Sequence, residues 1–367
     1  MEPKYQYTKD NHFKWGWENE DRSIDWYGPP KMDKIYHIKL GYVTRKVKSF
    51  RDECISTVEL MASTTNKPII VGLSGGSDSQ LVCISLMQAK IPFKALIVKF
   101  RYNNGSPVNM HDISVAYEFC KKYNVSYEEL DIDLEVFYRN KALEIAKKYY
   151  MPKLRTIVQT QAMEWAAMNG YYYIMAGGDP VFYPLKPGTR NIELMTDKCT
   201  VPCWIEGPVP IMQYMIDKEY EGCSKFYLYT PELHVSYLND HVVTEFLRTK
   251  KIIYENFIEW FPHENMWWKV FQNIFKPILT TKHFPEIIPA KKFTGFEGIY
   301  RQVSIPSNIN IYKNLINNAV KDISNSKSVI IPIEDIVPYL TRTTDLNKTF
   351  NNYDSSVIDN IAVDRDK

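Results

Sequence analysis

Hydrophobic and polar positions alternate through the middle of the chain in an order that predicts strands and helices in turn. Short apolar runs bounded by polar turns are typical of buried strands, and apolar residues three or four apart are typical of helices. The predicted strands are Ile69–Leu73, Lys94–Phe100, Ser126–Ile132 and Tyr171–Ala176. The predicted helices are Arg45–Met61, a segment that begins near Leu81, Asn109–Tyr123 and Leu154–Asn169. Strands that alternate with helices predict an α/β fold with a doubly wound parallel sheet.

The ends of the chain follow a different pattern. Residues 1–45 are aromatic and polar without clean periodicity, and we expect them to pack on the core as an extension. After about residue 230 the pattern is helical, over Asp240–Leu247, Ile252–Phe261 and Trp267–Phe275, and from Ser304 the chain is polar and rich in Asn. We therefore expect four regions: an extension and helix (1–62), the α/β domain (63–230), a helical region that completes the active site (231–303) and a polar extension (304–367).

A turn that combines glycines with serines and one aspartate follows the first predicted strand. It reads Ser74-Gly75-Gly76-Ser77-Asp78-Ser79 and leads into a helix. Glycines let the backbone approach a polyanion closely, and a helix start offers free N–H groups and a positive dipole end. The serines add hydrogen-bond donors, and the Asp78 carboxylate suits a phosphate-bound Mg²⁺. The turn is not a Walker A loop, because its spacing is too short and no Lys follows the second glycine.

A second turn of similar chemistry follows the strand Tyr171–Ala176. It contains Gly177, Gly178 and Asp179. Ligands of doubly wound sheets bind beyond the carboxyl ends of the strands, and parallel strands place both turns at that edge. We therefore expect Asp78 and Asp179 to hold one Mg²⁺ between them. An ordinary Gly-Asp-Pro turn is the alternative interpretation.

The first turn resembles the PP-loop, SGGxDS, of the ATP pyrophosphatase superfamily. The resemblance implies a sheet of the adenine nucleotide alpha hydrolase-like type, ATP and Mg²⁺ as cofactors, and transfer of AMP to a substrate. It implies that ATP contacts Ser74, Gly75, Gly76, Ser77, Asp78, Ser79, Gly177 and Gly178, with the adenine near Val98, Lys99 and Phe100. A PP-loop followed by a Gly-Gly-Asp turn is most similar to the synthetase domain of asparagine synthetase and to β-lactam synthetase.

Two further segments resemble that branch. Leu228–Leu247 is similar to its Pro-Phe-Leu-Asp segment and the helix that follows, and Pro289–Phe296 is similar to its Arg-x-Lys-x-Gly-Phe segment. The family's critical lysine falls on Lys291 or Lys292, and the alignment does not choose between them. With Asp78 they are the predicted catalytic residues, because a lysine can neutralise charge that grows on the pyrophosphate. The alternative is a pair of solvated surface lysines.

The chain also departs from asparagine synthetase. No Cys stands at the amino terminus, and the first ~60 residues are shorter than a glutaminase domain, so we expect no hydrolysis of glutamine. The predicted function is an ATP-dependent ligase that adenylates a substrate oxygen and passes the product to ammonia or an amine. The resemblance covers roughly residues 65–300 and does not extend to the acceptor pocket.

Composition adds few constraints. The 367 residues include 45 basic and 43 acidic side chains, and this balance does not favour a nucleic-acid partner, so we expect a small-molecule substrate. No apolar run approaches the ~20 residues of a membrane helix, and the polar start lacks a signal core, so we expect a cytoplasmic protein without a membrane partner.

Two rival functions stay open at this point. PP-loop sulfurtransferases and nucleobase-modifying enzymes use the same loop, often with a reactive thiol or zinc. Cys199 and Cys203 form one close pair, with Cys223 and His234 downstream, where structural zinc usually needs two pairs. The other rival is a nucleotide-binding module without catalysis, and the intact glycines and carboxylates of both turns argue against it.

Overall fold

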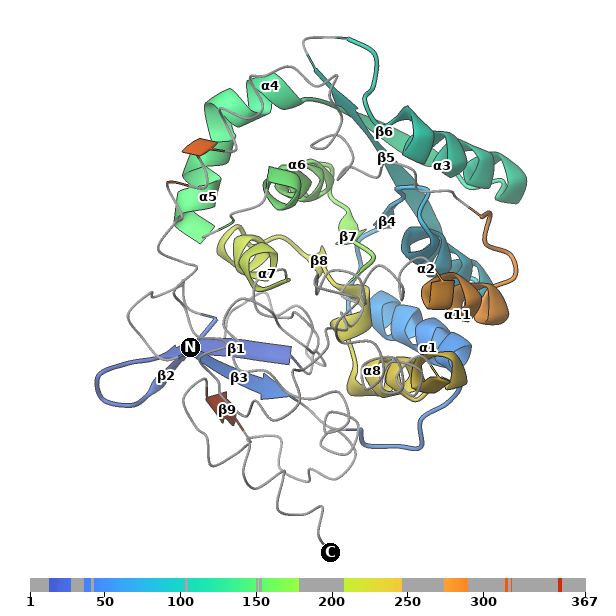
Figure 1. Cartoon of the computed structure of the whole chain (residues 1–367), viewed down its shortest axis with the longest axis horizontal. Helices are drawn as coiled ribbons and strands as arrows, with labels where there is room; N and C mark the ends of the chain where they lie inside the picture. The colour runs from blue at the N-terminus through green and yellow to red at the C-terminus, as the bar shows by residue number, and fades with distance from the viewer. Residues whose placement is uncertain are drawn as a thin grey trace, which may run out of the picture.

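A five-stranded parallel sheet forms the centre of the structure (Figure 1). The strands are β4 (Ile69–Gly72), β5 (Phe93–Arg101), β6 (Tyr127–Asp133), β7 (Tyr172–Ile174) and β8 (Gly222–Cys223). Their order is β6-β5-β4-β7-β8, so the chain starts in the middle, builds to one edge and then returns to build the other. This order confirms the predicted doubly wound sheet and puts the reversal between β4 and β7, where such sheets bind their ligands.

The computed structural model describes only part of the chain. The described residues are 13–27, 36–40, 43–102, 105–149, 151, 154–177, 208–245, 274–289, 314–315, 318 and 349–351. Several predicted residues lie outside these ranges: Gly178, Asp179, Cys199, Cys203, Lys291 and Lys292.

Helices cover both faces of the sheet. On one face lie α1 (Phe50–Ser63), α2 (Ser77–Gln88) and α3 (Met110–Tyr123), and on the other lie α6 (Leu154–Met168) and α7 (Pro208–Asp217) (Figure 1). The chain between β6 and α6 is also helical, through α4 (Leu134–Phe137), the π-helical turn η1 (Tyr138–Ala142) and α5 (Leu143–Tyr149). Central sheet residues such as Ile70, Val71 and Leu96 are fully buried. Burial on both faces explains why β4 and the middle of β5 are continuous apolar runs, whereas the edge strand β6 alternates.

Helix α1 begins five residues later than the sequence pattern predicts. Ser49 caps it by accepting a hydrogen bond from the Asp52 N–H. The chain before the cap is held instead by the buried carboxylate of Glu53, which accepts two 2.6 Å bonds from the Arg45 guanidinium and one of 2.7 Å from the Lys48 N–H. The apolar spacing of the sequence extends upstream of Ser49, but the helix begins only after this capping serine.

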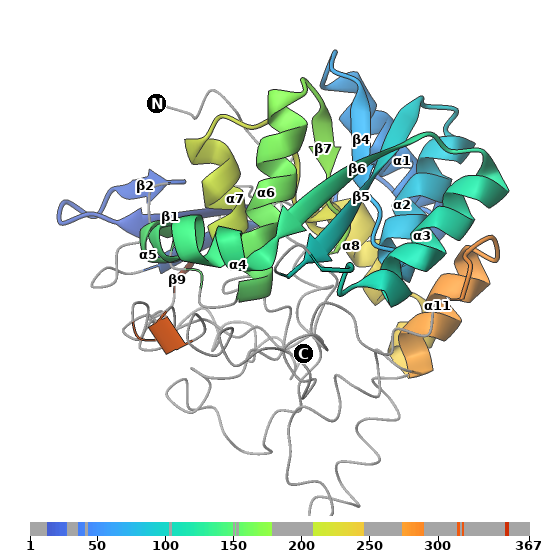
Figure 2. The same ribbon diagram turned by 90° about the horizontal axis from the view of Figure 1, so that it is seen from above.

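The N-terminal segment forms strands, which its irregular pattern did not predict. Strands β1 (Phe13–Glu18), β2 (Ile24–Trp26) and β3 (Tyr36–Leu40) pair antiparallel, and β9 (Thr349–Asn351) adds to β3. This small sheet lies at the opposite end of the molecule from α2 and α3 in both ribbon views (Figures 1 and 2). The two terminal regions of the sequence therefore share one sheet.

Two helices from the later part of the chain pack near α1 and α2. Helix α8 (Pro231–Leu238) is capped by Thr230, and α11 (Lys276–His283) is followed by a short coil to residue 289. Arg51 of α1 fixes this coil by pairing with Glu286 and by lying 5.1 Å over the Phe284 ring. The predicted helix Asp240–Leu247 is described as helical over 241–245, and Ile252–Phe261 lies outside the described residues. No described helix is long and apolar enough to span a membrane.

The last turn of α11 is fastened to the chain after α8 by one carboxylate. Asp240 is 7% exposed, and His283 Nε2 lies 2.6 Å from its Oδ2. An ionised carboxylate only accepts hydrogen bonds, so the imidazole nitrogen is the donor. Burial by itself would raise the pKa of Asp240, but the bonds from His283, Lys282 and the Val242 N–H outweigh it and lower the pKa to about 2.

Replacing Asp240 by Asn should therefore destabilise the protein at neutral pH. The pKa of this carboxyl is lower when folded, so its stabilisation is present above about pH 4 and is lost as the pH falls toward 2. We expect a loss on the order of 2 kcal/mol at pH 7, shrinking below pH 4. Urea unfolding of D240N and wild type across this range measures it. D131N, which removes a half-exposed partner of Arg101, is the control and should change stability little. A D240N deficit independent of pH would contradict the assignment.

Candidate active site

The glycine turn joins β4 to α2 at the carboxyl edge of the sheet. Gly75 has φ +78°, and a Cβ there would lie 2.1 Å from the backbone oxygen of Asp112 in α3. Both facts require glycine. Gly76 is the N-cap of α2 and makes no side-chain capping bond. The first turn of α2, from Ser77 to Ser79, therefore begins with backbone N–H groups that the helix itself does not use.

The serines of the turn divide into two kinds. Ser79 is 3% exposed, accepts from the Ser74 N–H at 3.2 Å and donates to the Gly76 carbonyl at 2.9 Å. It holds the turn in shape. Ser74 and Ser77 are more exposed and can reach a ligand, although the Ser74 hydroxyl also accepts from the Gly76 N–H at 3.4 Å. The sequence pattern treated all three as equivalent donors.

Gln80, the fourth residue of α2, was not singled out from the sequence. Its side chain is fully buried and donates to the Gly75 carbonyl at 2.8 Å and to the Ile288 carbonyl at 3.0 Å. Its amide oxygen accepts from the Ile288 N–H at 2.8 Å. One side chain thus ties the glycine turn to the coil after α11, 208 residues away.

Asp78 is held by two side chains from distant parts of the chain. Its Oδ1 accepts from the Tyr227 hydroxyl at 2.9 Å, and its Oδ2 accepts from the Lys276 ammonium at 2.8 Å. The Asp78 side chain is 25% exposed, whereas Lys276 is only 7% exposed. The sequence predicted Asp78 as a site residue but gave no signal for Tyr227 or Lys276.

Tyr227 also reaches the second glycine turn. Its N–H donates to the carbonyl of Gly177 at 3.2 Å, and Gly177 has φ +113°, which again favours glycine. The Tyr227 ring is stacked 6.1 Å from the Phe50 ring and packs against Tyr237, so it is rigidly placed. Tyr227 lies in the 3-10 turn η3 (Phe226–Leu228), between β8 and α8. The structure therefore brings Gly177 and Asp78 to one edge of the sheet, and the pairing of Asp78 with Asp179 stays a prediction.

The segment of β5 predicted to lie near adenine, Val98 to Phe100, has most of its backbone groups hydrogen-bonded within the protein. The side chain of Asn109 donates to the Val98 carbonyl at 2.8 Å and accepts from the Phe100 N–H at 3.0 Å. The Phe100 carbonyl accepts from the Val108 N–H at 2.7 Å. Lys99 forms an ion pair with Glu129 on the neighbouring strand β6. An adenine here would need other groups or would displace Asn109, and its position stays a prediction.

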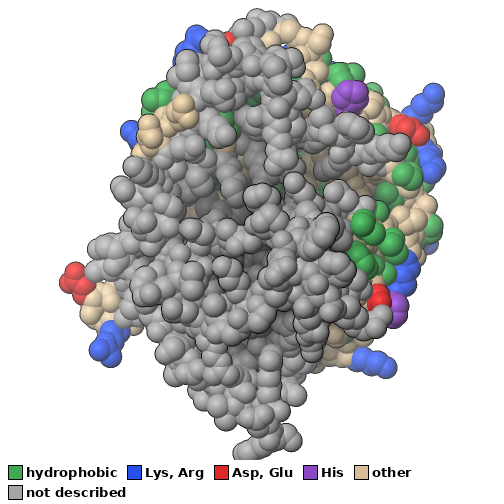
Figure 3. Space-filling view, viewed as in Figure 1, with side chains coloured by type: hydrophobic (Ala, Val, Ile, Leu, Met, Phe, Trp, Pro, Cys, Tyr) green, Lys and Arg blue, Asp and Glu red, His purple; other side chains and the backbone are tan. Residues whose placement is uncertain are grey.

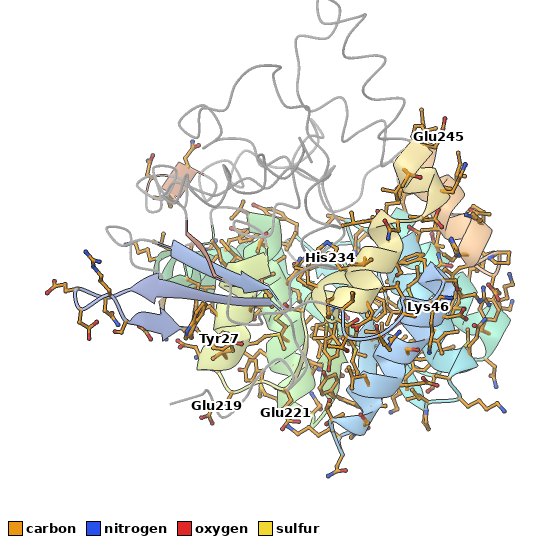
Figure 4. All side chains as sticks on the ribbon, turned by 90° about the horizontal axis from the view of Figure 1, so that it is seen from below. Tyr27, Lys46, Glu219, Glu221, His234 and Glu245 are labelled. Carbon is orange, nitrogen blue, oxygen red and sulfur yellow. The ribbon has the colours of Figure 1, made fainter. Side chains whose placement is uncertain are left out.

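The cysteines and histidine considered for zinc fall in two places. Cys223 lies in β8, where burial raises its pKa to about 12. His234 lies on α8 (Figure 4), where burial lowers its pKa to about 3. Both are core residues, and Cys199 and Cys203 lie outside the described ranges. Among the residues that the structure describes, no three His, Cys, Asp or Glu side chains group as a metal site.

No family model matches the chain, and no curated protein matches its sequence. Among solved structures it is similar to an NH3-dependent NAD synthetase from Campylobacter jejuni in complex with nitrate, at 18% identity and a TM-score of 0.29, over 65% of this chain and 98% of that one. It is similar to an NMN synthetase from Francisella tularensis, at 15% identity and a TM-score of 0.29, over 77% and 97%. It is also similar to the U34-tRNA thiolase NcsA from Methanococcus maripaludis with its [4Fe-4S] cluster, at 13% identity and a TM-score of 0.27, over 66% and 82%. The site is therefore interpreted from its own residues.

Replacing Gly75 by Ala should damage both stability and the site, because the new Cβ meets the Asp112 carbonyl and the positive φ is strained. We expect a loss of roughly 3 kcal/mol or more in the free energy of unfolding, because the turn must move away from α3. Gly170→Ala is the matched control, since Gly170 has φ +74° with nothing within 4 Å of its added Cβ. That variant should lose only about 1 kcal/mol. Thermal unfolding measures the loss in both variants, and equal losses would contradict the contact with α3.

Proposed function

We propose that the chain is an ATP-dependent adenylating enzyme that releases pyrophosphate. The observation that supports this most is the junction at Asp78, where the open start of α2, the glycine turn and Gly177 are drawn together by Tyr227 and Gln80. A helix start behind a glycine turn binds anionic phosphate through backbone N–H groups. A carboxylate in the same turn suits a cation that accompanies the phosphates.

The residues present fit a bound Mg²⁺. This ion is usually held by one or two carboxylates together with substrate phosphates, and Asp78 supplies one partly exposed carboxylate at the right place. Asp179 is our proposed second ligand. The described chain enters this turn at Gly177, whose carbonyl is fixed by Tyr227, and Asp179 follows two residues later. When bound, the ion would neutralise phosphate charge and orient the leaving group.

The proposed reaction has two steps. A substrate oxygen, such as that of a carboxylate, attacks the α-phosphorus of ATP, a new P–O bond forms, and the α–β anhydride bond breaks to release pyrophosphate. Ammonia or an amine then attacks the activated carbon, loses a proton, and the C–O bond to AMP breaks. The N–H groups of the first turn of α2 would bind the departing phosphates, as preorganised donors do for developing charge. Adenylation is the general part of this proposal, and formation of an amide is its more specific part.

Lys291 and Lys292 stay our proposed transition-state lysines. The last described residues before them are tethered, because Ile288 forms two hydrogen bonds with Gln80 of α2. The described chain before both lysines therefore ends close to the glycine turn, and this supports the proposal.

Sulfur transfer is the second candidate, and the described residues give it less support. Cys54 and Cys83 are fully buried, and burial raises both pKa values well above the usual range for a thiol. Burial also raises the pKa of Cys120 to about 11. Reactive thiols have low pKa values and access to solvent. Such chemistry would have to use Cys199 or Cys203.

Asp78→Ala and Asp179→Ala should each abolish the release of pyrophosphate at a temperature where the variant is folded. Each change would remove a proposed metal ligand, and Asp78→Ala would also remove the carboxylate that pairs with Lys276, which lowers stability. Asp131→Ala, on the surface of β6, is the control and should retain activity. The measurement is AMP and pyrophosphate formed from ATP across a panel of carboxylic acids with ammonia. Full turnover in either site variant would exclude that residue, and sulfur transfer instead of AMP formation would favour the second candidate.

Neutralising the correct lysine of the pair should lower kcat and kcat/KM together, by roughly 10²-fold or more, because the lost contact is made in the transition state. ATP binding should change little. Lys291→Met, Lys292→Met and the double variant are compared with Lys121→Met, an exposed lysine of α3. Normal turnover in all three would make the segment structural and would limit the asparagine-synthetase resemblance to the two glycine turns.

A further inference from the structure

Gln80 holds the carbonyl of one glycine together with both backbone groups of a distant residue. Its Nε2 donates to the Gly75 carbonyl at 2.8 Å and to the Ile288 carbonyl at 3.0 Å, and its Oε1 accepts from the Ile288 N–H at 2.8 Å. A side-chain amide has two N–H donors, and both are used. Because the side chain is fully buried, water does not compete for these bonds. Gln80 therefore fixes the peptide unit that begins at Gly75.

The peptide unit between Gly75 and Gly76 could face either of two ways. Its rotation changes ψ of Gly75 and φ of Gly76, and neither residue has a Cβ that would resist the change. The unit is trans, so its carbonyl and its N–H point in opposite directions. With the carbonyl held by Gln80, the Gly76 N–H points toward Ser74, whose hydroxyl accepts from it at a long 3.4 Å. A flipped unit would present an oxygen there instead.

Backbone N–H groups matter at this turn because it supplies no cation of its own. The segment Ser74–Ser79 contains no Lys or Arg. On the face drawn in Figure 3, the Lys and Arg side chains of the described residues are scattered around the margin and do not gather in one patch. The Gly76 carbonyl accepts from the Ser79 hydroxyl at 2.9 Å. Ser79 and Gln80 thus engage both glycine carbonyls, so that neither oxygen is left to repel an anion.

We propose that Gln80 is a positioning residue that keeps the Gly76 N–H turned toward the phosphate site and links this orientation to the coil after α11. The inference rests on the proposed phosphate site at the glycine turn and adds a residue to it. The coil is also anchored independently of Gln80, since the Tyr123 hydroxyl donates to the Glu286 carbonyl at 2.5 Å. The anchored coil holds the Gln80 amide, and the amide holds the peptide.

The test is the affinity of the folded protein for inorganic pyrophosphate, measured by calorimetry in the presence of Mg²⁺. Gln80→Met keeps the length of the side chain but removes its amide. It should bind pyrophosphate about tenfold more weakly than wild type, the effect of losing one hydrogen bond to a charged group. A purely structural Gln80 predicts a variant that is less stable but binds pyrophosphate as tightly as wild type, and this result would overturn the proposal.

Gln88→Met is the matched control. Gln88 is an exposed glutamine about three turns further along α2, and its Nε2 donates to Glu286 of the same coil. The control therefore removes a bond between α2 and the coil but leaves the glycine turn untouched. Its affinity for pyrophosphate should equal that of wild type, and an equal loss in both variants would overturn the specific role of Gln80.

A measurement on the wild-type protein covers the case in which Gln80→Met does not unfold cooperatively. Hydrogen exchange of the Ile288 N–H requires its bond to Gln80 to open. Coupling is reciprocal, so if opening weakens pyrophosphate binding about tenfold, saturating pyrophosphate should slow this exchange about tenfold. The Ile287 N–H, which bonds to the Phe284 carbonyl within the coil, is the control and should change little. Unchanged exchange at Ile288, or equal slowing of both amides, would overturn the link.

The two proposals fail in different ways. A wild-type protein that binds neither pyrophosphate nor an ATP analogue would overturn the adenylating function, and the phosphate site with it. Wild-type binding that Gln80→Met keeps in full would overturn the role of Gln80 alone.

Discussion

The ion pair between Asp78 and Lys276 is the contact on which the arrangement of the site depends. It joins the first turn of α2 to the start of α11, 198 residues later in the chain. The coil after α11 is fixed separately by Gln80, which bonds both backbone groups of Ile288. Between these two points α11 lies beside α2, and Arg51 secures the following coil through Glu286. The site is thus assembled from both halves of the sequence.

Burial makes this contact more consequential than an ordinary surface ion pair. Exposed pairs such as Lys94 with Glu128 contribute about 0–1 kcal/mol, because water screens both charges. Lys276 is 7% exposed, so water screens this ion pair much less than it screens an exposed one. Forming such a pair costs desolvation free energy, and breaking it costs stability.

The sequence predicted the parts of the fold that local patterns decide. Apolar runs such as Ile69–Leu73 and the helical spacing of Asn109–Tyr123 correspond closely to β4 and α3, and their alternation predicts the sheet. The glycine turn was recognisable because its backbone geometry allows few residue types, as the positive φ of Gly75 shows. Local patterns did not predict the features that depend on a helix cap or on a partner distant in the sequence. Ser49 shortened α1 at its start, and pairing between distant strands formed the small terminal sheet.

Tyr227, Gln80 and Lys276 could not be found in the sequence for the same reason. Each is an ordinary residue type in an unremarkable local context, and its role comes from a partner 149 to 208 residues away. A Walker-type loop carries its lysine within the loop, so its charge can be read from one motif. Here the cation that meets the loop's carboxylate comes from α11. The glycine turn packs against α3 at Gly75, and its carboxylate is paired by a residue of α11. The phosphate binding that we propose would therefore depend on the folded tertiary structure and not on the motif alone.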